Sequence, residues 1–470
     1  MNTLVMKFGG SAIGTTTTLA QVLSIVLHEH EQWDHVVLVV SALEGVTDAL
    51  IEAAHLAQLG QQRGYRRIVA NLRTRHLALI EELPFGGTER AALQADIDRL
   101  LFDMLDIYQS MAQSSDNAIS RASIDATIGV GEKMAARIIA ALLRQNALKS
   151  VAIDTTSLIV TDEVFGNATP NMVLTRQQIG KNLLPLLERD IVPVITGFIG
   201  ATSSGQPTTL GRGGSDYTAS VLGVCVNATE IWIWTDVDGM MTADPREVES
   251  AKVIPQLSYE EAAELAYFGA RVLHARMIGP VSAQKIPLYV KNINKPQKTG
   301  TLIHHYEARQ KHELKAVTSI TGLVVEAERD GNLTPVTAVY DKSLFSALPG
   351  PIDVIVSSQS SSHALTCFLI PTTAGVDAIH SIRSTLEEGL HDNPLTAAWA
   401  VKTAVFVTAI CSQLNEWAEV TAAIFRCMKD INIIAISQSP SRCSLSLVVE
   451  SKDAETALYN IHRLISDGIA

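Results

Sequence analysis

The chain has 470 residues, of which 47% are hydrophobic and 18% are charged, so it is too apolar to be disordered and too long for one ordinary core. Its formal net charge of −12 argues against nonspecific binding to nucleic acid or to an anionic membrane, because both need a basic field. No apolar run approaches the ~20 residues that span a bilayer. We therefore expect two or three folded domains in a cytoplasmic protein, with five scattered cysteines that are reduced and buried.

A glycine pair follows the first predicted strand. The stretch MKFGGSAIG, Met6 to Gly14, places Lys7 and the pair Gly9-Gly10 almost at the start of the chain. Adjacent glycines let the backbone approach a ligand, and a following helix would point its N–H groups at the same spot. The stretch suits a phosphate, although a tight turn is the commoner use of such a pair.

From Thr3 to about Ile303 the sequence alternates between short apolar runs and helical stretches. The runs are β-branched and nearly continuous in apolar character, as in strands buried on both faces of a parallel sheet. They lie at His35–Ala42, Ser150–Thr155, Ile191–Gly200, Glu230–Gly239 and Ile286–Asn292. The pattern predicts an α/β three-layer sandwich with a mainly parallel sheet over residues 1–305, carrying a helical insertion at about residues 60–115.

A polar stretch at His304–Lys315 marks the predicted domain boundary. Beyond it, Asp353–Pro371 and Asn432–Glu450 each read as strand, Ser-Gln-Ser turn and strand, and each precedes an amphipathic helix. This internal repeat predicts two small α+β domains, at residues 316–395 and 396–470, which pair side by side.

Two further motifs place charged residues where ligands bind. In TLGRGGSDYTA, Arg212 sits in a glycine turn, where a guanidinium can grip a carboxylate or phosphate bidentately, and the next helix is expected to be capped by Ser215 or Asp216. In IWTDVDGMMTADPREV, Thr235 and Asp236 end a buried strand, the usual place for ligands in open α/β sheets. The glycines and charges of the first motif contribute little to a core, so function is favoured there. The aspartates of the second are equally well explained as turn formers.

Glu132 in GVGEKMAAR begins a helix, and FGARVLHARMI is expected to bring Arg271 and His274 together on another. Taken alone, Glu132 is best explained as a partner of its helix dipole, and His274 as a packed core histidine. Neither residue indicates a function by itself.

Together these motifs resemble the aspartate kinases of the amino-acid kinase family. The resemblance runs from Leu4 to Ile303 through KFGGS, VVSALEGVTDALI, GEKMAAR, ITGFIG, TLGRGGSDYTA, WTDVDGMMTADPREV, FGARVLHARMI and IPLYVKNINKPQKTGTLI, in the family's order. The C-terminal repeat resembles the paired ACT domains that bind amino-acid effectors in this family.

The resemblance implies transfer of the γ-phosphoryl group of MgATP to the side-chain carboxylate of L-aspartate, the first step toward lysine, threonine and methionine. It assigns catalysis to Lys7 and Asp216, and aspartate binding to Ser41, Thr47, Glu132, Phe198 and Arg212. The nucleotide would be contacted by Lys7, Gly9, Gly10, Ser11, Gly213, Gly214, Thr235, Asp236, Met241, Arg246 and Arg271. ATP and Mg²⁺ are the implied cofactors, and no dedicated protein ligands for the metal are expected, because phosphates and water can hold it.

Several residues depart from the family's pattern. Ser11 replaces a common threonine, Met241 a usual tyrosine and Arg271 a usual lysine, which puts nucleotide affinity in question. The Ser-Glu pair expected in each ACT turn is Ser362-His363 and Ser441-Arg442 here, so an amino-acid effector is expected without an identity. A homo-oligomer is implied, either a dimer through the ACT-like domains or a tetramer. The chain's end at Ala470 leads us to expect a monofunctional enzyme without homoserine dehydrogenase.

Two other functions compete with this interpretation. A related kinase could act on another acidic amino acid, such as glutamate. A kinase-like scaffold could instead sense amino acids without turnover, which the substitutions at Met241 and Arg271 would allow.

Overall fold

The computed structural model describes residues 2–113, 121–269, 272–305, 314–328, 353–360, 363–370, 376–391, 398–411 and 418–467. Its contacts divide the chain into two compact units. The first comprises Met1–Met240, Pro255–Tyr259 and Val272–His305; the second comprises Met241–Ile254, Glu260–Arg271 and Tyr306–Ala470. The predicted boundaries at residues 305, 316 and 396 remain predictions.

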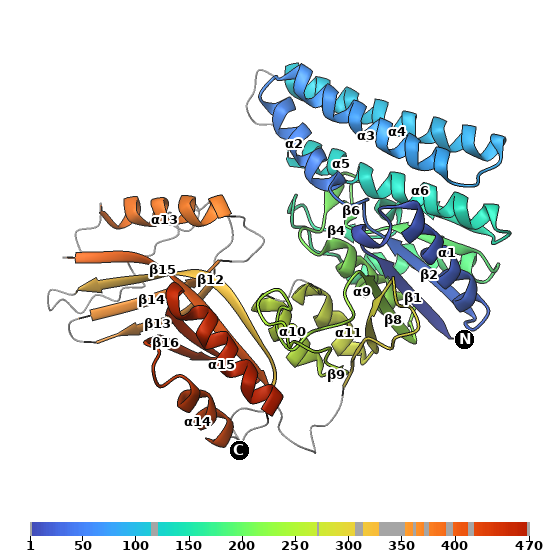
Figure 1. The fold of residues 1–470 in the computed structure, drawn as a ribbon. Coiled ribbons are helices and arrows are strands. Elements are labelled where there is room, and N and C mark those ends of the chain that lie inside the picture. The colour runs from blue at the N-terminus through green and yellow to red at the C-terminus, as the bar shows by residue number, and fades with distance from the viewer. Residues whose placement is uncertain are drawn as a thin grey trace. The chain divides into compact units, whose positions relative to one another are not determined.

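An eight-stranded sheet forms the centre of the first unit, in the order β3-β5-β2-β1-β8-β10-β11-β9 (Figure 1). Its strands are β1 Thr3–Phe8, β2 His35–Val40, β3 Ser150–Ile153, β5 Val192–Thr196, β8 Glu230–Thr235, β9 Gln256–Leu257, β10 Leu288–Asn292 and β11 Thr301–Ile303. All neighbouring pairs are parallel except β10 and β11. Strand β5 is buried throughout, and β1 and β2 are buried except at Lys7 and His35, as their continuous apolar runs predicted.

Helices cover both faces of this sheet and complete the three layers of the predicted sandwich. Helix α6 packs on β2, β3 and β5 and contacts α1, whereas α9 packs on β1, β2 and β8 and contacts α7 and α11. Their bounds are α1 Thr16–His30, α6 Val130–Gln145, α7 Met172–Asn182, α8 Leu184–Leu187, α9 Gly214–Cys225 and α11 Ile278–Gln284. Because β1 and β8 pair in parallel, their carboxyl ends lie side by side at one edge of the sheet, where the predicted ligand residues begin.

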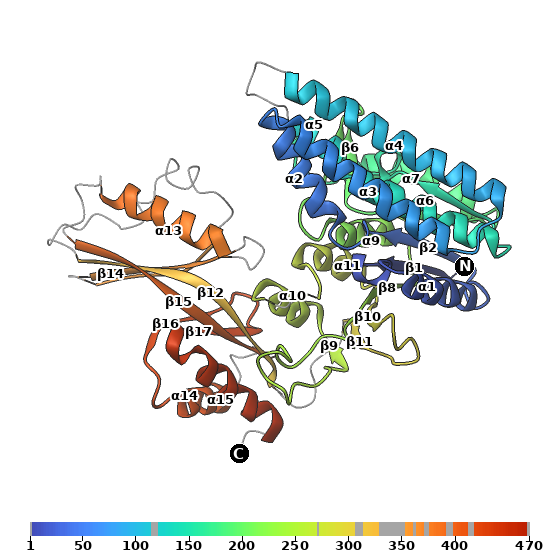
Figure 2. The ribbon, with the colours of Figure 1, turned by 45° about the horizontal axis from the view of Figure 1, so that its top comes forward.

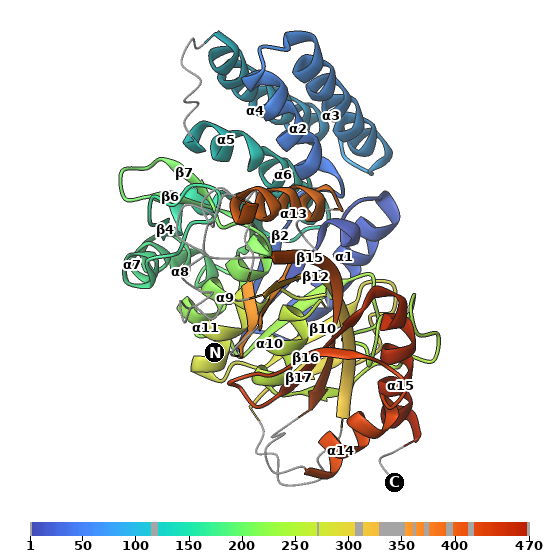
Figure 3. The same ribbon diagram turned by 90° about the vertical axis from the view of Figure 1, so that its left-hand side faces the viewer.

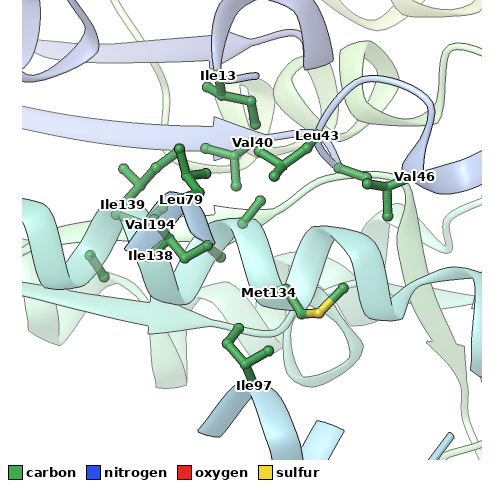
Figure 4. Packing of buried hydrophobic residues seen from close by; sticks show 14 of the residues in the cluster. Ile13, Val40, Leu43, Val46, Leu79, Ile97, Met134, Ile138, Ile139 and Val194 are labelled. Carbon is green, nitrogen blue, oxygen red and sulfur yellow. The ribbon is translucent and has the colours of Figure 1, made fainter. Parts of the chain in front are cut away.

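The predicted helical insertion is present. Helix α2 (Val46–Gln58) leads into α3 (Gln62–Glu82) and α4 (Gly87–Gln113), which lie side by side, and α5 (Arg121–Ile128) precedes α6 (Figure 2). Their apolar stripes continue the core of the sandwich: Ile97 of α4 and Met134 of α6 belong to one buried cluster (Figure 4). The insertion therefore covers α6 and is part of the main core.

One predicted strand is divided between two sheets. The run Ile191–Gly200 forms β5, then breaks at Gly197 and Phe198 and resumes as β6 (Ile199–Thr202) in a three-stranded sheet with β4 (Val160–Thr161) and β7 (Pro207–Thr209). Phe198 adopts a φ of 71°, a left-handed conformation that interrupts the strand. Apolar character alone could not show this break.

The second unit contains a six-stranded antiparallel sheet in the order β13-β14-β12-β15-β17-β16. The strands are β12 Leu314–Glu328, β13 Asp353–Gln359, β14 His363–Leu369, β15 Ala398–Cys411, β16 Ile433–Gln438 and β17 Ser444–Glu450, with helices α13 Val376–His391, α14 Ala418–Cys427 and α15 Ala454–Asp467. Both halves of the predicted repeat form antiparallel pairs followed by a helix, so the two α+β domains share one sheet. Helix α15 packs on β12 and β15 and contacts α14 (Figure 3).

Two segments that precede residue 305 belong to the second unit. Ala243 and Val248 are buried in an apolar cluster with residues of β15, β17, α14 and α15. Phe268, at the end of α10 (Tyr259–Tyr267), is buried in another cluster with residues of β12, β14 and β15. These segments contribute to the core beneath the antiparallel sheet.

All five cysteines are free, and four of them are buried. Among the described residues, no helix is both long enough and apolar enough to cross a membrane.

Candidate active site

A cavity of about 750 Å³ in the first unit brings the predicted site residues together. Nine of its lining residues were predicted from the sequence: Lys7, Ser41, Thr47, Glu132, Phe198, Arg212, Gly213, Gly214 and Asp216. The others are Asp48, Ile51, Arg121, Ile124, Asp125, Ile128, Phe165, Gly166, Thr209, Gly211 and Ser215. Lys7, Glu132 and Arg212, which come from three distant segments, therefore face one space.

Lys7 reaches this cavity from the end of β1. Its Nζ lies 2.5 Å from Oδ1 of Asp216, and the two side chains are only 12% and 11% exposed. Asp216 is in the first turn of α9, where the helix dipole favours a negative charge. The ion pair holds the ammonium at the cavity wall, where it can meet an anion.

The glycine pair lies directly beside this ammonium. A Cβ at Gly9 would be 3.5 Å from Lys7 Nζ, and one at Gly10 would be 2.9 Å from the carbonyl oxygen of Ala42. The Gly9 N–H donates to the carbonyl oxygen of Trp234 in β8 (3.2 Å), which ties the turn to the neighbouring strand end. The absence of side chains thus leaves room next to Nζ for a bulky anion such as a phosphate.

Arg212 lies in a left-handed glycine turn between β7 and α9. Gly211 and Gly213 have φ values of 74° and 65°, conformations that residues with a Cβ rarely adopt. The helix begins at Gly214 with Gly213 as its N-cap, so the predicted cap at Ser215 or Asp216 is wrong. Arg212 lines the cavity together with Asp48; burial lowers the pKa of Arg212, and the charge of Asp48 opposes this effect.

Glu132 is a buried carboxylate in the first turn of α6. Burial raises its pKa to about 7, and hydrogen bonding to backbone N–H groups only partly offsets that effect. Its buried Oε2 has no hydrogen-bond partner among the described residues. A buried carboxylate of this kind is stabilised by a cation, and its side chain faces a cavity large enough to admit one.

The face of α5 that lines the cavity was missed in the sequence. Arg121, Ile124, Asp125 and Ile128 follow i, i+3, i+4 and i+7 spacing, which places them on one side of the helix and could have identified them. The Asp125 carboxylate accepts hydrogen bonds from the N–H groups of Gly166 and Thr209, each at 2.8 Å, and from Thr209 Oγ1 at 3.0 Å. It therefore fastens β7 and the residue 166 loop around the cavity.

Ser41 and Thr47 line the cavity from the segment between β2 and α2, and Phe198 lines it from the break between β5 and β6. The left-handed conformation of Phe198 is held from both sides: its N–H donates to Thr218 Oγ1 (3.1 Å), and its carbonyl accepts from Leu210 N–H (2.8 Å). Strained residues that neighbours hold in place are typical of ligand sites. The backbone that carries the Phe198 side chain is consequently fixed at the cavity wall.

Other predicted nucleotide contacts lie outside the cavity lining. Thr235 and Asp236 follow β8, where Thr235 Oγ1 donates to Asp236 Oδ1 at 3.1 Å. Met241 and Arg246 belong to the second unit, and Arg246 Nε donates to Asp244 Oδ1 at 3.0 Å. Ser11 lies in a short 3₁₀ turn after the glycine pair. For these five residues the nucleotide role remains a prediction.

His274 is not on a helix, contrary to the sequence prediction. It caps a 3₁₀ turn at Ala275–Met277, because its Nδ1 accepts the Arg276 N–H at 3.3 Å. Burial lowers its pKa, and Asp216 opposes this effect. Arg271, its predicted companion, lies outside the described residues.

The cavity can hold a small zwitterion next to a polyanion. Glu132 offers a negative charge for an ammonium group, Arg212 offers a fork for a carboxylate, and Lys7 offers a positive charge beside an open glycine turn. These three side chains thus provide ion recognition and charge neutralisation in a protein whose net charge is negative.

Comparisons with known proteins agree with this arrangement. The profile of the amino acid kinase family matches residues 2–292, and that of an ACT domain matches residues 407–464. Lysine-sensitive aspartokinase 3 of Escherichia coli is 29% identical to the chain, and the match covers 98% of each. The chloroplastic bifunctional aspartokinase/homoserine dehydrogenase 1 of Zea mays is 30% identical over 97% of this chain and 50% of its own length. The chain spans about half the length of the curated relatives it matches first.

Solved structures show the same likeness in three dimensions. E. coli aspartokinase III in complex with aspartate and ADP has a TM-score of 0.80 and 27% identity to this chain, and the match covers 98% of this chain and 99% of that one. The same protein in complex with lysine and aspartate has a TM-score of 0.78 at the same identity. The fold similarity therefore extends over both units.

Proposed function

Because the chain belongs to the amino acid kinase family, we propose that it transfers the γ-phosphoryl group of ATP to the side-chain carboxylate of L-aspartate, giving 4-phospho-L-aspartate. The observation that carries this proposal is that Lys7, Glu132 and Arg212 line one cavity. The similarity of the chain to an aspartokinase whose structure was solved with aspartate and ADP supports the choice of substrates.

The geometry supports a mechanism based on alignment and charge neutralisation. Glu132 receives the substrate ammonium and Arg212 its α-carboxylate, which orients the side-chain carboxylate along the cavity. Ser41, Thr47 and Phe198 complete the binding of aspartate, with hydroxyl groups and an aromatic wall. A carboxylate is already ionised at neutral pH and needs no strong base, so positioning can supply much of the rate enhancement.

Lys7 neutralises charge on the transferred phosphoryl group, and Asp216 holds Lys7 in place. One oxygen of the substrate carboxylate forms a bond to the γ-phosphorus as the bond to the β,γ-bridging oxygen breaks, and ADP leaves with that electron pair. Mg²⁺ is brought by ATP, whose phosphates hold it together with water. The glycine turn beside Lys7 leaves room for the phosphates.

The second unit is proposed to bind an amino-acid effector and to form a homo-oligomer through its ACT-like sheet. An ACT domain match at residues 407–464 and the similarity to an aspartokinase solved with lysine support this role. We also propose that the protein acts in the cytoplasm, as its reduced thiols would allow.

A hydroxamate assay with ATP, Mg²⁺ and aspartate tests the proposed activity. Trapping of the acyl phosphate as a hydroxamate is expected with aspartate, and a lower rate with glutamate. The absence of product from either acid at millimolar concentrations would favour a sensor without turnover. A higher rate with glutamate would favour the related kinase, and addition of lysine or threonine would identify an effector.

A further inference from the structure

We infer that Arg276 is a positioning residue for aspartate binding: it holds the glycine turn that carries Arg212, and so sets the affinity for the substrate α-carboxylate. This inference rests on the proposed function. Arg276 is not among the residues that line the cavity, so it would act through the turn and not on the substrate.

The guanidinium of Arg276 joins three backbone segments around the turn. Its Nη1 donates to Asn167 Oδ1 at 2.6 Å and to the carbonyl oxygen of Leu210 at 2.7 Å, and its Nη2 donates to the carbonyl oxygen of Ala168 at 3.3 Å. Its Cζ lies 4.9 Å from the ring centroid of Tyr217 in α9. A planar, multidentate group is suited to this task, and a single ammonium cannot reproduce it.

Two of these partners, Leu210 and Tyr217, lie within a few residues of Arg212 in the sequence. Leu210 precedes the turn, and Tyr217 is in the first turns of the helix that follows it. The Leu210 N–H is engaged by the Phe198 carbonyl, so both backbone groups of this buried residue are fixed. Arg276 thereby anchors the turn on its entry side and on its exit side.

The turn also packs closely against the segments that Arg276 joins. A Cβ at Gly211 would be 2.6 Å from Asn167 Oδ1, and one at Gly213 would overlap the His274 side chain. His274 is only two residues before Arg276, and it accepts the Arg276 N–H. Loss of the Arg276 side chain would therefore loosen the turn on both sides of Arg212, and the backbone that carries Arg212 would be less well fixed.

Steady-state kinetics of Arg276→Ala test this inference. The KM for aspartate is expected to rise at least tenfold, with kcat changed less than threefold and a smaller rise in the KM for ATP, because Gly213 and Gly214 of the same turn are predicted nucleotide contacts. Guanidinium chloride at millimolar concentration is expected to restore part of the affinity, which would not occur if the substitution only weakened folding. The affinity for aspartate measured by calorimetry should be highest for the wild type, lower for the variant with added guanidinium and lowest for the variant alone.

A double variant tests whether the effect passes through Arg212. In an Arg212→Ala background, Arg276→Ala should add less than a twofold change to the KM for aspartate. A full tenfold addition would show that Arg276 acts elsewhere and would overturn the inference. An unchanged KM in a folded Arg276→Ala variant would overturn it as well.

Two further variants complete the design. Arg276→Lys, which keeps the charge on one donor nitrogen, covers the case in which the alanine variant does not fold. A smaller rise in the KM for aspartate is expected with lysine. A wild-type KM would contradict the role of the planar guanidinium. Arg90→Ala is the matched control, because Arg90 likewise donates to a side-chain oxygen, here the Glu81 carboxylate, and to a backbone carbonyl, that of Leu83, but within the helical insertion. A wild-type chain that neither binds nor phosphorylates aspartate would overturn both proposals, whereas an active wild type with unaffected Arg276 variants would overturn this one alone.

Discussion

The ion pair of Lys7 and Asp216 leads to a prediction about catalysis. Replacement of Lys7 by alanine should lower kcat at least a thousandfold and change the KM for aspartate less than threefold, because its charge acts mainly on the phosphoryl oxygens in the transition state. Initial rates over a range of aspartate concentrations would show this division. A large rise in KM with a preserved kcat would instead place Lys7 in substrate binding.

The environment of Glu132 predicts a pH dependence. Its pKa is about 7 in the free protein, and only the ionised carboxylate attracts an ammonium group. The affinity for aspartate should therefore be nearly constant above pH 8 and fall toward tenfold per pH unit below pH 7, as the carboxylate becomes protonated. Calorimetric titrations between pH 5.5 and 8.5 would measure this change in the affinity for aspartate.

Glu132→Gln is the control for this pH dependence. The amide has a similar size but no charge, so its weak aspartate binding should lack the rise in affinity through pH 7. An unchanged slope in the variant would assign the titration to another group.

The sequence predicted some of the side chains that line the cavity and missed others. Lys7 and Arg212 were singled out because each lies beside a glycine turn, whereas the site roles of Glu132 and Asp216 were implied only by the family resemblance. All four line one cavity. Asp125 was missed because its role depends on N–H groups of Gly166 and Thr209, which are distant in the sequence. Only the fold makes those N–H groups neighbours of its carboxylate.

A comparison of two glycines, one of them in the turn before α9, separates the free-energy cost of a left-handed backbone from the cost of overpacking. Gly213 and Gly205 both have left-handed φ values, of 65° and 85°, but only Gly213 packs against His274; no atom lies within 4 Å of a Cβ at Gly205. Gly205→Ala should destabilise the protein by ~1 kcal/mol of conformational strain. Gly213→Ala should cost roughly 3 kcal/mol, because overpacking is added.

Thermal and urea denaturation would compare these two variants. Gly213→Ala should also raise the KM for aspartate, since the turn carries Arg212, whereas Gly205→Ala should leave it unchanged. Equal losses of stability would mean that His274 yields to the added methyl group without cost.

Secondary structure was predictable wherever one local pattern sufficed. Continuous apolar runs identified the central strands, and the repeated strand-turn-strand pattern identified β13, β14, β16 and β17. The break at Phe198 was not predictable, because hydrogen bonds to Thr218 Oγ1 and from the Leu210 N–H hold that residue in an unusual conformation. The helix cap at Gly213 was missed for a similar reason: backbone conformation, and not a capping side chain, ends the turn.

The ACT-like turn before β17 shows how a distant residue can supply a group that the local sequence lacks. Its Ser441-Arg442 sequence has no carboxylate, yet Glu264 of α10 accepts hydrogen bonds from Ser441 Oγ and Ser444 Oγ, each at 2.7 Å. Ser441 and Glu264 are 177 residues apart, so no local motif could predict their contact. The turn therefore has a carboxylate partner in spite of its departure from the family's pattern.

Two segments link the predicted kinase region to the core of the second unit. Ala243, Val248 and Phe268 precede residue 305 but are buried among strands and helices that follow residue 314. A fragment of residues 1–305 would expose all three, and the apolar surface that they cover would be lost with the remainder. Residues 1–305 are thus expected to depend on the rest of the chain for stability.

Expression of residues 1–305 alone would test this dependence. The fragment should aggregate or melt well below the full chain, and co-expression with residues 306–470 should restore solubility and activity, because the missing core would be rebuilt around Val248 and Phe268. Size-exclusion chromatography and calorimetry would report both effects. A fragment that stays monomeric, with the melting temperature of the whole protein, would show that the boundary at residue 305 separates two independent domains.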